Sequence, residues 1–241
     1  MVNNLFIRLG LDKIMTTNFG IYKRIKINTQ LSPQQMAGFS SRPSVQEAID
    51  KTHLKLQEII QQKLKSGDKI LDIGCGAGAY LINIKGDFEL TGIDLNEEMI
   101  QAAKSKLPNA TFIKDDFLKH DFDHKFNLIY SVSTLEFIPP SQLRAFFRKV
   151  QLILEPDGIL FLHYPHALRF KDTLYPDLYY IEYSPRKVEY ELRDHYQIIS
   201  HQHGFDNRII DLYDQKPYEP GIRTFKNGYL LIASPKGKPT H

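Results

Sequence analysis

Hydrophobic residues along this 241-residue chain recur in two patterns, and the two patterns alternate. Short apolar runs such as Lys69–Ile73 are typical of buried strands, whereas the apolar positions from Val45 to Leu64 recur at helical spacing. Strands that alternate with helices predict an α/β fold with a doubly wound, mainly parallel sheet and right-handed crossovers. The predicted strands are 69–73, 88–93, 110–114, 126–131 and 158–163, and further helices are predicted at 78–84, 96–105 and 141–153.

The pattern changes after the fifth predicted strand. Residues 164–183 are too many for a tight connection, are rich in tyrosine, and follow a strand end where ligands bind in open α/β sheets. We expect this segment to be a lid or acceptor-binding loop; the alternative is a long loop that buries its own aromatic residues.

A helix is predicted to follow this segment, with Ser184 as N-cap and Pro185 as first residue. Its apolar stripe is Val188, Leu192, Tyr196 and Ile199. Residues 208–212 and 228–233 have strand patterns. His201 and His203 have the spacing of a metal-binding pair, but no third ligand is near in sequence, so we expect a surface helix end and no metal.

Composition agrees with one domain, 42–241, preceded by an N-terminal capping segment, 1–41. The chain is 42% hydrophobic, and its single cysteine, Cys75, excludes an internal disulfide. No apolar run approaches the ~18 residues of a membrane span, and no signal-peptide pattern is present, so a cytoplasmic location is expected. The net charge of +3 is too balanced to indicate a nucleic-acid partner.

A glycine-rich turn carries the most specific signal. Ile70–Ile73 runs directly into Gly74, Gly76 and Gly78, so a strand end leaves main-chain N–H groups open to a ligand. A second strand ends about twenty residues later in Asp94, whose carboxylate can accept hydrogen bonds from a ribose diol. These features predict a site for an adenosine-bearing cofactor.

Two cofactors fit that description, since the glycines also match the loose fingerprint of dinucleotide-binding folds. Asp72 distinguishes them: an acid at the end of the first strand repels a pyrophosphate but suits a ligand with an ammonium and a sulfonium. Here the chain resembles the class I S-adenosylmethionine-dependent methyltransferases, whose first motif matches Ile70-Leu-Asp-Ile-Gly-Cys-Gly-Ala-Gly78. The resemblance covers roughly 70–163, and implies a Rossmann-like sheet of seven strands with an antiparallel last strand.

The resemblance also implies cofactor contacts, residue by residue. Asp72 and the glycine loop would hold the methionine end of S-adenosylmethionine, Asp94 the ribose hydroxyls, and Leu95 the adenine face. The third segment would supply Asp116 for the adenine amino group and the Phe117 N–H for a ring nitrogen, with Asp115 as the neighbouring alternative to Asp116. The full predicted cofactor set is Asp72, Gly74, Cys75, Gly76, Gly78, Asp94, Leu95, Asp116, Phe117 and Ser131, in which Cys75 is a small filler of the glycine turn.

Methyl transfer depends mainly on orientation, but a hydroxyl acceptor benefits from a general base. His163, at the end of the fifth strand, is the first candidate, followed by Glu136 and His166. Each has a plain structural alternative: a hydrogen-bonded strand-end histidine, a helix-start acid and a solvated loop residue.

A motif that is missing from the sequence limits the class of molecule that can be the methyl acceptor. No Asn/Asp-Pro-Pro-Tyr/Phe tetrapeptide follows the fourth strand, where the chain reads Ser131-Val-Ser-Thr134. This counts against enzymes that methylate the exocyclic amines of bases or amide side chains. We expect a small-molecule acceptor, most favourably an oxygen of a natural product or sugar. An RNA or protein methyltransferase is the alternative, followed by a non-catalytic cofactor-binding module.

Overall fold

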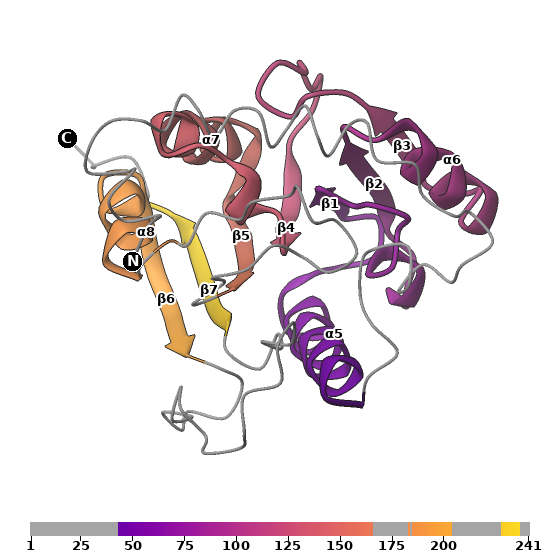
Figure 1. Ribbon diagram of the computed structural model, residues 1–241, viewed down its shortest axis with the longest axis horizontal. Coiled ribbons are helices and arrows are strands. Elements are labelled where there is room, and N and C mark those ends of the chain that lie inside the picture. Colours follow the sequence, from indigo (N-terminus) through magenta and orange to yellow (C-terminus); the bar gives the residue numbers. More distant parts are fainter. Residues whose placement is uncertain (1–42, 166–182, 184, 204–227, 237–241) are drawn as a thin grey trace, which may run out of the picture.

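The computed structural model describes residues 43–165, 183, 185–203 and 228–236. They form an α/β unit in which helices cover both faces of one sheet (Figure 1). The strands are β1 (Lys69–Ile73), β2 (Glu89–Asp94), β3 (Thr111–Lys114), β4 (Phe126–Val132), β5 (Leu154–Pro165), β6 (Tyr196–His203) and β7 (Gly228–Pro235). The helices are α5 (Pro43–Lys63), α6 (Glu97–Lys106), α7 (Pro140–Ile153) and α8 (Pro185–Leu192), with single 3₁₀ turns η1 (Leu81–Asn83) and η2 (Leu135–Phe137).

The sheet has seven strands in the order β3-β2-β1-β4-β5-β7-β6. Strands β1 to β5 pair in parallel, and β7 lies antiparallel between β5 and β6. The predicted doubly wound, seven-stranded fold with an antiparallel last strand is therefore confirmed. The direction of winding reverses between β1 and β4, and ligands of such sheets bind at the carboxyl ends of the strands on either side of this point.

Two hydrophobic clusters, one on each face, hold the helices to the sheet. Leu56 and Ile60 of α5 pack with Leu128 and Phe161 on one face, together with α6. Helices α7 and α8 pack on the opposite face against residues such as Leu162. Because side chains alternate along a strand, His163 lies on the α5 face of β5 and Tyr164 on the α7 face.

Helix α6 begins directly after the carboxyl end of β2. The Asn96 side chain accepts a hydrogen bond from the Met99 N–H at 3.0 Å and so caps the helix. Glu97 and Glu98 occupy the first turn, and lysines occupy the last, which complements the helix dipole. The cap holds the chain close to Asp94, at the edge where the cofactor is expected.

Two predicted helical segments differ from the structure. The helix predicted at 78–84 is only the 3₁₀ turn η1, because Gly78 has φ +75°, outside the α region. The helix that starts at Pro185 ends at Leu192, and the next residues form β6. His201 and His203 therefore lie on a strand and not at a helix end.

Several predicted features lie outside the described residues. They are the N-terminal capping segment, His166, the N-cap Ser184, the strand at 208–212, and the lid segment apart from its two ends, Tyr164, Pro165 and Tyr183.

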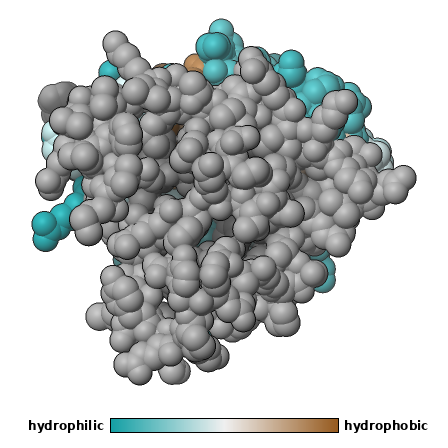
Figure 2. All heavy atoms as spheres, in the orientation of Figure 1, coloured by the Kyte–Doolittle hydropathy of each residue, from teal (hydrophilic) through white to brown (hydrophobic). Residues whose placement is uncertain are grey.

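The described atoms visible in Figure 2 are mainly hydrophilic, with one small hydrophobic area. Among the described helices, none is both long enough and apolar enough to cross a membrane. The large apolar side chains of this part of the chain lie mostly in the two clusters between helices and sheet.

Candidate cofactor and acceptor site

The glycine loop leaves β1 in a backbone conformation that side chains disfavour. Gly74, Gly76 and Gly78 have φ of +75°, +51° and +75°. The Gly74 and Cys75 N–H groups donate to the Ile93 carbonyl, at 2.8 and 3.1 Å, which fastens the loop to β2. A Cβ on Gly76 would meet no heavy atom within 4 Å, so this residue borders open space where a ligand can approach the main chain.

Asp94 at the end of β2 faces that loop. Its Oδ2 accepts the Gly76 N–H at 2.9 Å, and its Oδ1 accepts the Asn96 N–H at 2.8 Å. Burial raises the pKa of Asp94 to about 6, although these backbone N–H groups act in the opposite direction. A carboxylate has about four lone-pair positions and three main-chain N–H groups bond to Asp94, so the ionised Asp94 keeps capacity for a ribose hydroxyl.

Asp72 is buried at the carboxyl end of β1, with 2% of its surface exposed. Burial raises its pKa well above the usual range, the charge of Asp94 adds to this, and the Tyr130 hydroxyl opposes it. Among the described residues, none makes a hydrogen bond of normal geometry to Asp72 Oδ2 or to the Tyr130 hydroxyl. A buried carboxyl group beside an open glycine loop fits a cationic ligand, and the ammonium and sulfonium of S-adenosylmethionine meet that requirement.

The third predicted segment follows β3. Asp116 is partly buried and accepts the Leu118 N–H at 3.0 Å, and its carboxylate lies 3.4 Å from Lys119 Nζ. Asp115 faces His120 at 3.0 Å and accepts the Asp116 N–H at 2.7 Å. Both acids are therefore held in place, and the assignment between them remains a prediction. The Phe117 side chain is buried in the core cluster beside α7.

Three further predicted cofactor residues lie around the ends of β1, β2 and β4. The Ser131 hydroxyl donates to the Ile73 carbonyl at 3.0 Å, and so ties β4 to the start of the glycine loop. Cys75 is buried, and burial raises its thiol pKa well above the usual range; a Cβ on Gly92 would lie 2.8 Å from its Sγ. Leu95 is partly exposed, and its N–H also bonds to Asp94.

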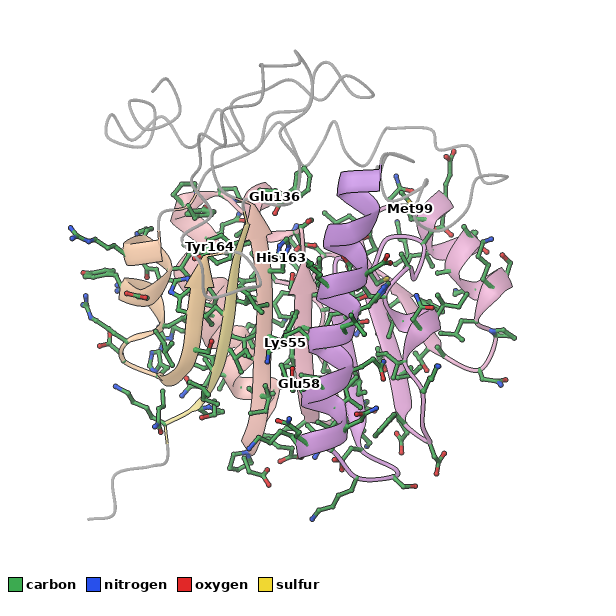
Figure 3. All side chains as sticks on the ribbon, turned by 90° about the horizontal axis from the view of Figure 1, so that it is seen from below. Lys55, Glu58, Met99, Glu136, His163 and Tyr164 are labelled. Carbon is green, nitrogen blue, oxygen red and sulfur yellow. The ribbon has the colours of Figure 1, made fainter. Side chains whose placement is uncertain are left out.

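The acceptor side of the site is formed by β5 and the turn after β4. His163 and Glu136 are both 2% exposed and lie toward the same end of the sheet (Figure 3). The 3₁₀ turn η2, which carries Glu136, packs against β5, and the Ser133 N–H donates to the His163 carbonyl at 2.9 Å. The structure thus places two of the three predicted general bases toward the same end of the sheet (Figure 3).

Burial moves the pKa values of these two groups in opposite directions. The pKa of His163 falls to about 4, and that of Glu136 rises to about 8. Both are therefore neutral at pH 7: the imidazole can accept a proton, and the carboxylic acid can donate a hydrogen bond. Among the described residues, none forms a hydrogen bond with Glu136 Oε2.

The β4–η2 turn contains residues that the sequence did not single out. Ser133 has φ +53° although it is not glycine, a conformation that carries strain and clusters at functional sites. Thr134 packs so closely on the glycine loop that a Cβ on Gly74 would lie 2.1 Å from its Oγ1. A run of small polar residues directly after a buried strand is the only signal that could have pointed to this turn.

No cluster of three or more histidine, cysteine, aspartate or glutamate side chains within the described ranges could hold a metal ion. His201 forms hydrogen bonds with Tyr164 and Glu189.

Comparison with known proteins agrees with this geometry. Residues 70–158 match the model of the methyltransferase domain family. Over 120 residues the chain is 34% identical to a carboxy-S-adenosyl-L-methionine synthase of Nautilia profundicola, in an alignment that covers 46% of this chain and 51% of that protein. The chain thus spans about half the length of this relative.

Solved structures show the same fold. An S-adenosylmethionine-dependent methyltransferase from Clostridium acetobutylicum aligns with a TM-score of 0.61 and 16% identity, covering 78% of this chain and 92% of that one. The N-methyltransferase NodS from Bradyrhizobium japonicum, in complex with S-adenosylhomocysteine, aligns with a TM-score of 0.60 and 16% identity, covering 83% and 90%. Residues 70–158 thus match a methyltransferase domain, and the chain has the fold of these solved S-adenosylmethionine-dependent methyltransferases.

Proposed function

We propose that this protein transfers the methyl group of S-adenosylmethionine to an oxygen atom of a small organic acceptor such as a natural product or sugar. The observation that carries the choice of oxygen is the buried, neutral His163 beside the turn that holds Glu136. A hydroxyl must lose its proton when its oxygen is methylated, and His163 is a proton acceptor at the expected position. The proposal includes a single methyltransferase domain over 42–241 and a cytoplasmic location.

The cofactor half of the mechanism rests on binding and orientation. Bound S-adenosylmethionine supplies a methyl group attached to a positively charged sulfur. Asp72 binds the cationic methionine end, Gly76 lets the cofactor lie against the main chain, and Asp94 accepts from the ribose. Leu95, Asp116 and Phe117 are proposed to bind the adenine.

On the acceptor half, His163 takes the proton from the acceptor hydroxyl, and Glu136 donates a hydrogen bond to a neighbouring acceptor oxygen. Both groups are removed from water, so these interactions are stronger than on a surface. Before the reaction Glu136 is protonated and His163 is neutral, because their pKa values, about 8 and about 4, lie on opposite sides of neutrality.

The matched relatives do not share one acceptor, since one is a carboxy-S-adenosyl-L-methionine synthase and another an N-methyltransferase. The acceptor class therefore rests on the residues of this chain. The near-neutral charge, 31 basic against 28 acidic residues, favours a small molecule over RNA.

The first experiment is calorimetric titration with S-adenosylhomocysteine, with NAD as a parallel control. We expect micromolar binding of the first and none of the second. Binding of NAD alone would replace the proposal with a dehydrogenase.

A screen of hydroxylated small molecules in the presence of S-adenosylmethionine then tests the acceptor. In His163→Ala we expect turnover on the identified acceptor to fall by about 10²–10⁴-fold with unchanged S-adenosylhomocysteine affinity. His195→Ala, in the turn between α8 and β6, is the matched control and should turn over like the parent protein. A His163→Ala protein that also turns over at the parental rate would exclude His163 as the base.

A further inference from the structure

A chain of hydrogen bonds links the end of β5 to the outer edge of the molecule. The Tyr164 hydroxyl lies 2.6 Å from His201 Nε2, and His201 Nδ1 lies 2.6 Å from Glu189 Oε1. Tyr164 is 1% exposed, and the side chains of His201 and Glu189 are 6% and 45% exposed. The chain therefore begins in the core beside the proposed catalytic residues and ends at the solvent.

The chemistry of the three groups sets the direction of each bond. A carboxylate only accepts, so Glu189 takes the Nδ1–H of His201. Neutral His201 then has an unprotonated Nε2, which accepts the hydroxyl proton of Tyr164. The acid thereby selects one tautomer of the imidazole, and that tautomer orients the phenol.

The three residues come from β5, β6 and α8, and β7 separates the two strands. In the register of the sheet Tyr164 pairs with Tyr229, and His201 pairs with Leu231. The Tyr164–His201 bond therefore crosses β7 diagonally on the α7 face. Backbone ladders join only neighbouring strands, so this bond adds a link between strands that are not neighbours.

The link reaches the acceptor side through the backbone. Tyr164 directly follows His163, and the His163 carbonyl accepts the Ser133 N–H at the start of the turn that carries Glu136. Tyr164 and His163 point to opposite faces of the sheet, so the phenol does not touch the reacting groups. Any role of Tyr164 in the reaction must therefore act through position.

We propose that Tyr164, His201 and Glu189 are positioning residues: their hydrogen-bonded chain holds the end of β5, and with it His163, in the geometry that methyl transfer requires. In Figure 3, Tyr164, His163 and Glu136 lie toward the same end of the sheet. This inference rests on the proposed function, because the position of His163 matters for the reaction only if His163 is the general base.

The chain offers a matched control for the loss of one tyrosine hydroxyl. Tyr196 is also buried, and its hydroxyl donates to the Phe147 carbonyl at 2.9 Å. It lies at the opposite end of β6, where it pairs with Pro235. Tyr164→Phe and Tyr196→Phe remove the same atom from the same hydrophobic cluster, but only the first touches the hydrogen-bonded chain.

The test uses the full-length protein labelled with ¹⁵N-histidine, so it needs no acceptor. Nuclear magnetic resonance of the ring nitrogens should show His201 in the Nδ1–H tautomer. In Tyr164→Phe, Glu189 still selects that tautomer, but we expect the His201 Nε2 signal and the His163 ring signals to shift. Tyr196→Phe should leave both unchanged, although thermal unfolding should show a comparable decrease in Tm in the two variants.

Two substitutions of Glu189, one conservative and one not, test the role of its carboxylate. Glu189→Gln keeps an oxygen acceptor for Nδ1–H and should keep the tautomer, whereas Glu189→Ala should lose it. His163 signals that stay in place in Tyr164→Phe, or that shift equally in Tyr196→Phe, would overturn the positioning role. Calorimetry with S-adenosylhomocysteine on the same samples tests the proposed function separately, because none of these substitutions touches the cofactor site.

Discussion

Asp94 holds the glycine loop and is also the residue proposed to bind the ribose of the cofactor. Its two oxygens accept main-chain N–H groups from Gly76 and Asn96, so the carboxylate is oriented before any ligand arrives. Prior orientation lowers the entropic cost of binding. The same burial that orients Asp94 raises its pKa to about 6, which places its ionisation within reach of an ordinary pH titration.

We therefore expect the affinity for S-adenosylhomocysteine to rise with pH and to level off above pH 7. Ionised Asp94 accepts from a ribose hydroxyl, while protonated Asp94 has lost much of that capacity; below pH 6 each ligand that binds must displace a proton. Binding should be about tenfold weaker at pH 5 than at pH 7, since roughly one molecule in ten is then ionised at this site. Calorimetry across this range measures the effect.

Asp94→Asn is the control for that titration. It should bind S-adenosylhomocysteine more weakly than the parent at pH 7, with an affinity that no longer follows a transition near pH 6. A parent protein with flat affinity from pH 5 to pH 7 would contradict the assignment of Asp94 to the ribose.

At the residue scale, the sequence predicted the two acids Asp72 and Asp94 as cofactor residues but did not predict their surroundings. Asp72 and Asp94 stand at fixed distances from glycines along the chain, so they could be recognised from local order. Ser133 has a left-handed backbone, and its N–H donates to the His163 carbonyl, thirty residues later in the sequence. Such a long-range contact leaves no local pattern.

The glycine loop is the element in which backbone conformation and ligand access coincide. Gly76 and Gly67 make a useful pair: both have positive φ, +51° and +84°, and a Cβ on either would meet nothing within 4 Å. Gly67 lies in the turn before β1, away from the carboxyl ends of the strands. The two differ in location and not in local strain or space.

For Gly76→Ala and Gly67→Ala we expect a similar loss of stability, of the order of 1 kcal/mol each, from the left-handed backbone. Only Gly76→Ala should also weaken S-adenosylhomocysteine binding, by at least tenfold, because its new methyl group occupies the space left for the ligand. Urea unfolding and calorimetry separate the two effects. Equal affinities in both variants would remove Gly76 from the ligand surface.

Elements were predicted well where the sequence marks both ends. Helix α6 has an asparagine cap and acids in its first turn, and its bounds were predicted to within one residue. Strand β6 was missed because no glycine or proline stands between Pro185 and His203 to mark where the helix stops. The alternation of Tyr196, Ile198 and Ser200 with more exposed residues is the period-two signal that could have revealed it.

At the scale of the whole molecule, the two halves of the sheet carry different parts of the proposed site. Strands β1 to β3 and α6 surround the cofactor residues, and β4, β5 and the turn η2 carry the acceptor residues. Asp72, Asp94, Glu136 and His163 are all nearly fully buried, and they lie at the carboxyl ends of parallel strands or in the turn after one. Burial of such groups lowers the free energy of unfolding, and natural proteins tolerate this cost where the groups are needed for function.

Glu136 makes that cost measurable. Its pKa is about 8 in the folded protein against an ordinary 4.5, so between these values the folded state holds a proton that the unfolded state releases. The contribution of Glu136 to stability is therefore fully present below about pH 4.5 and is lost as pH rises to 8, by at most about 1.4 kcal/mol per pH unit. Glu136→Gln imitates the protonated acid and has no proton to lose.

We thus expect Glu136→Gln and the parent to have similar free energies of unfolding at pH 5, and the variant to be more stable by a few kcal/mol at pH 8. Urea unfolding at several pH values gives the difference. Glu58→Gln on α5 is the control, since that exposed carboxylate is held ionised by Lys55 and should show no such gain. A Glu136→Gln protein whose advantage does not grow with pH would mean that Glu136 ionises in the folded state as it does in water, and the neutral acid required on the acceptor side would be lost with it.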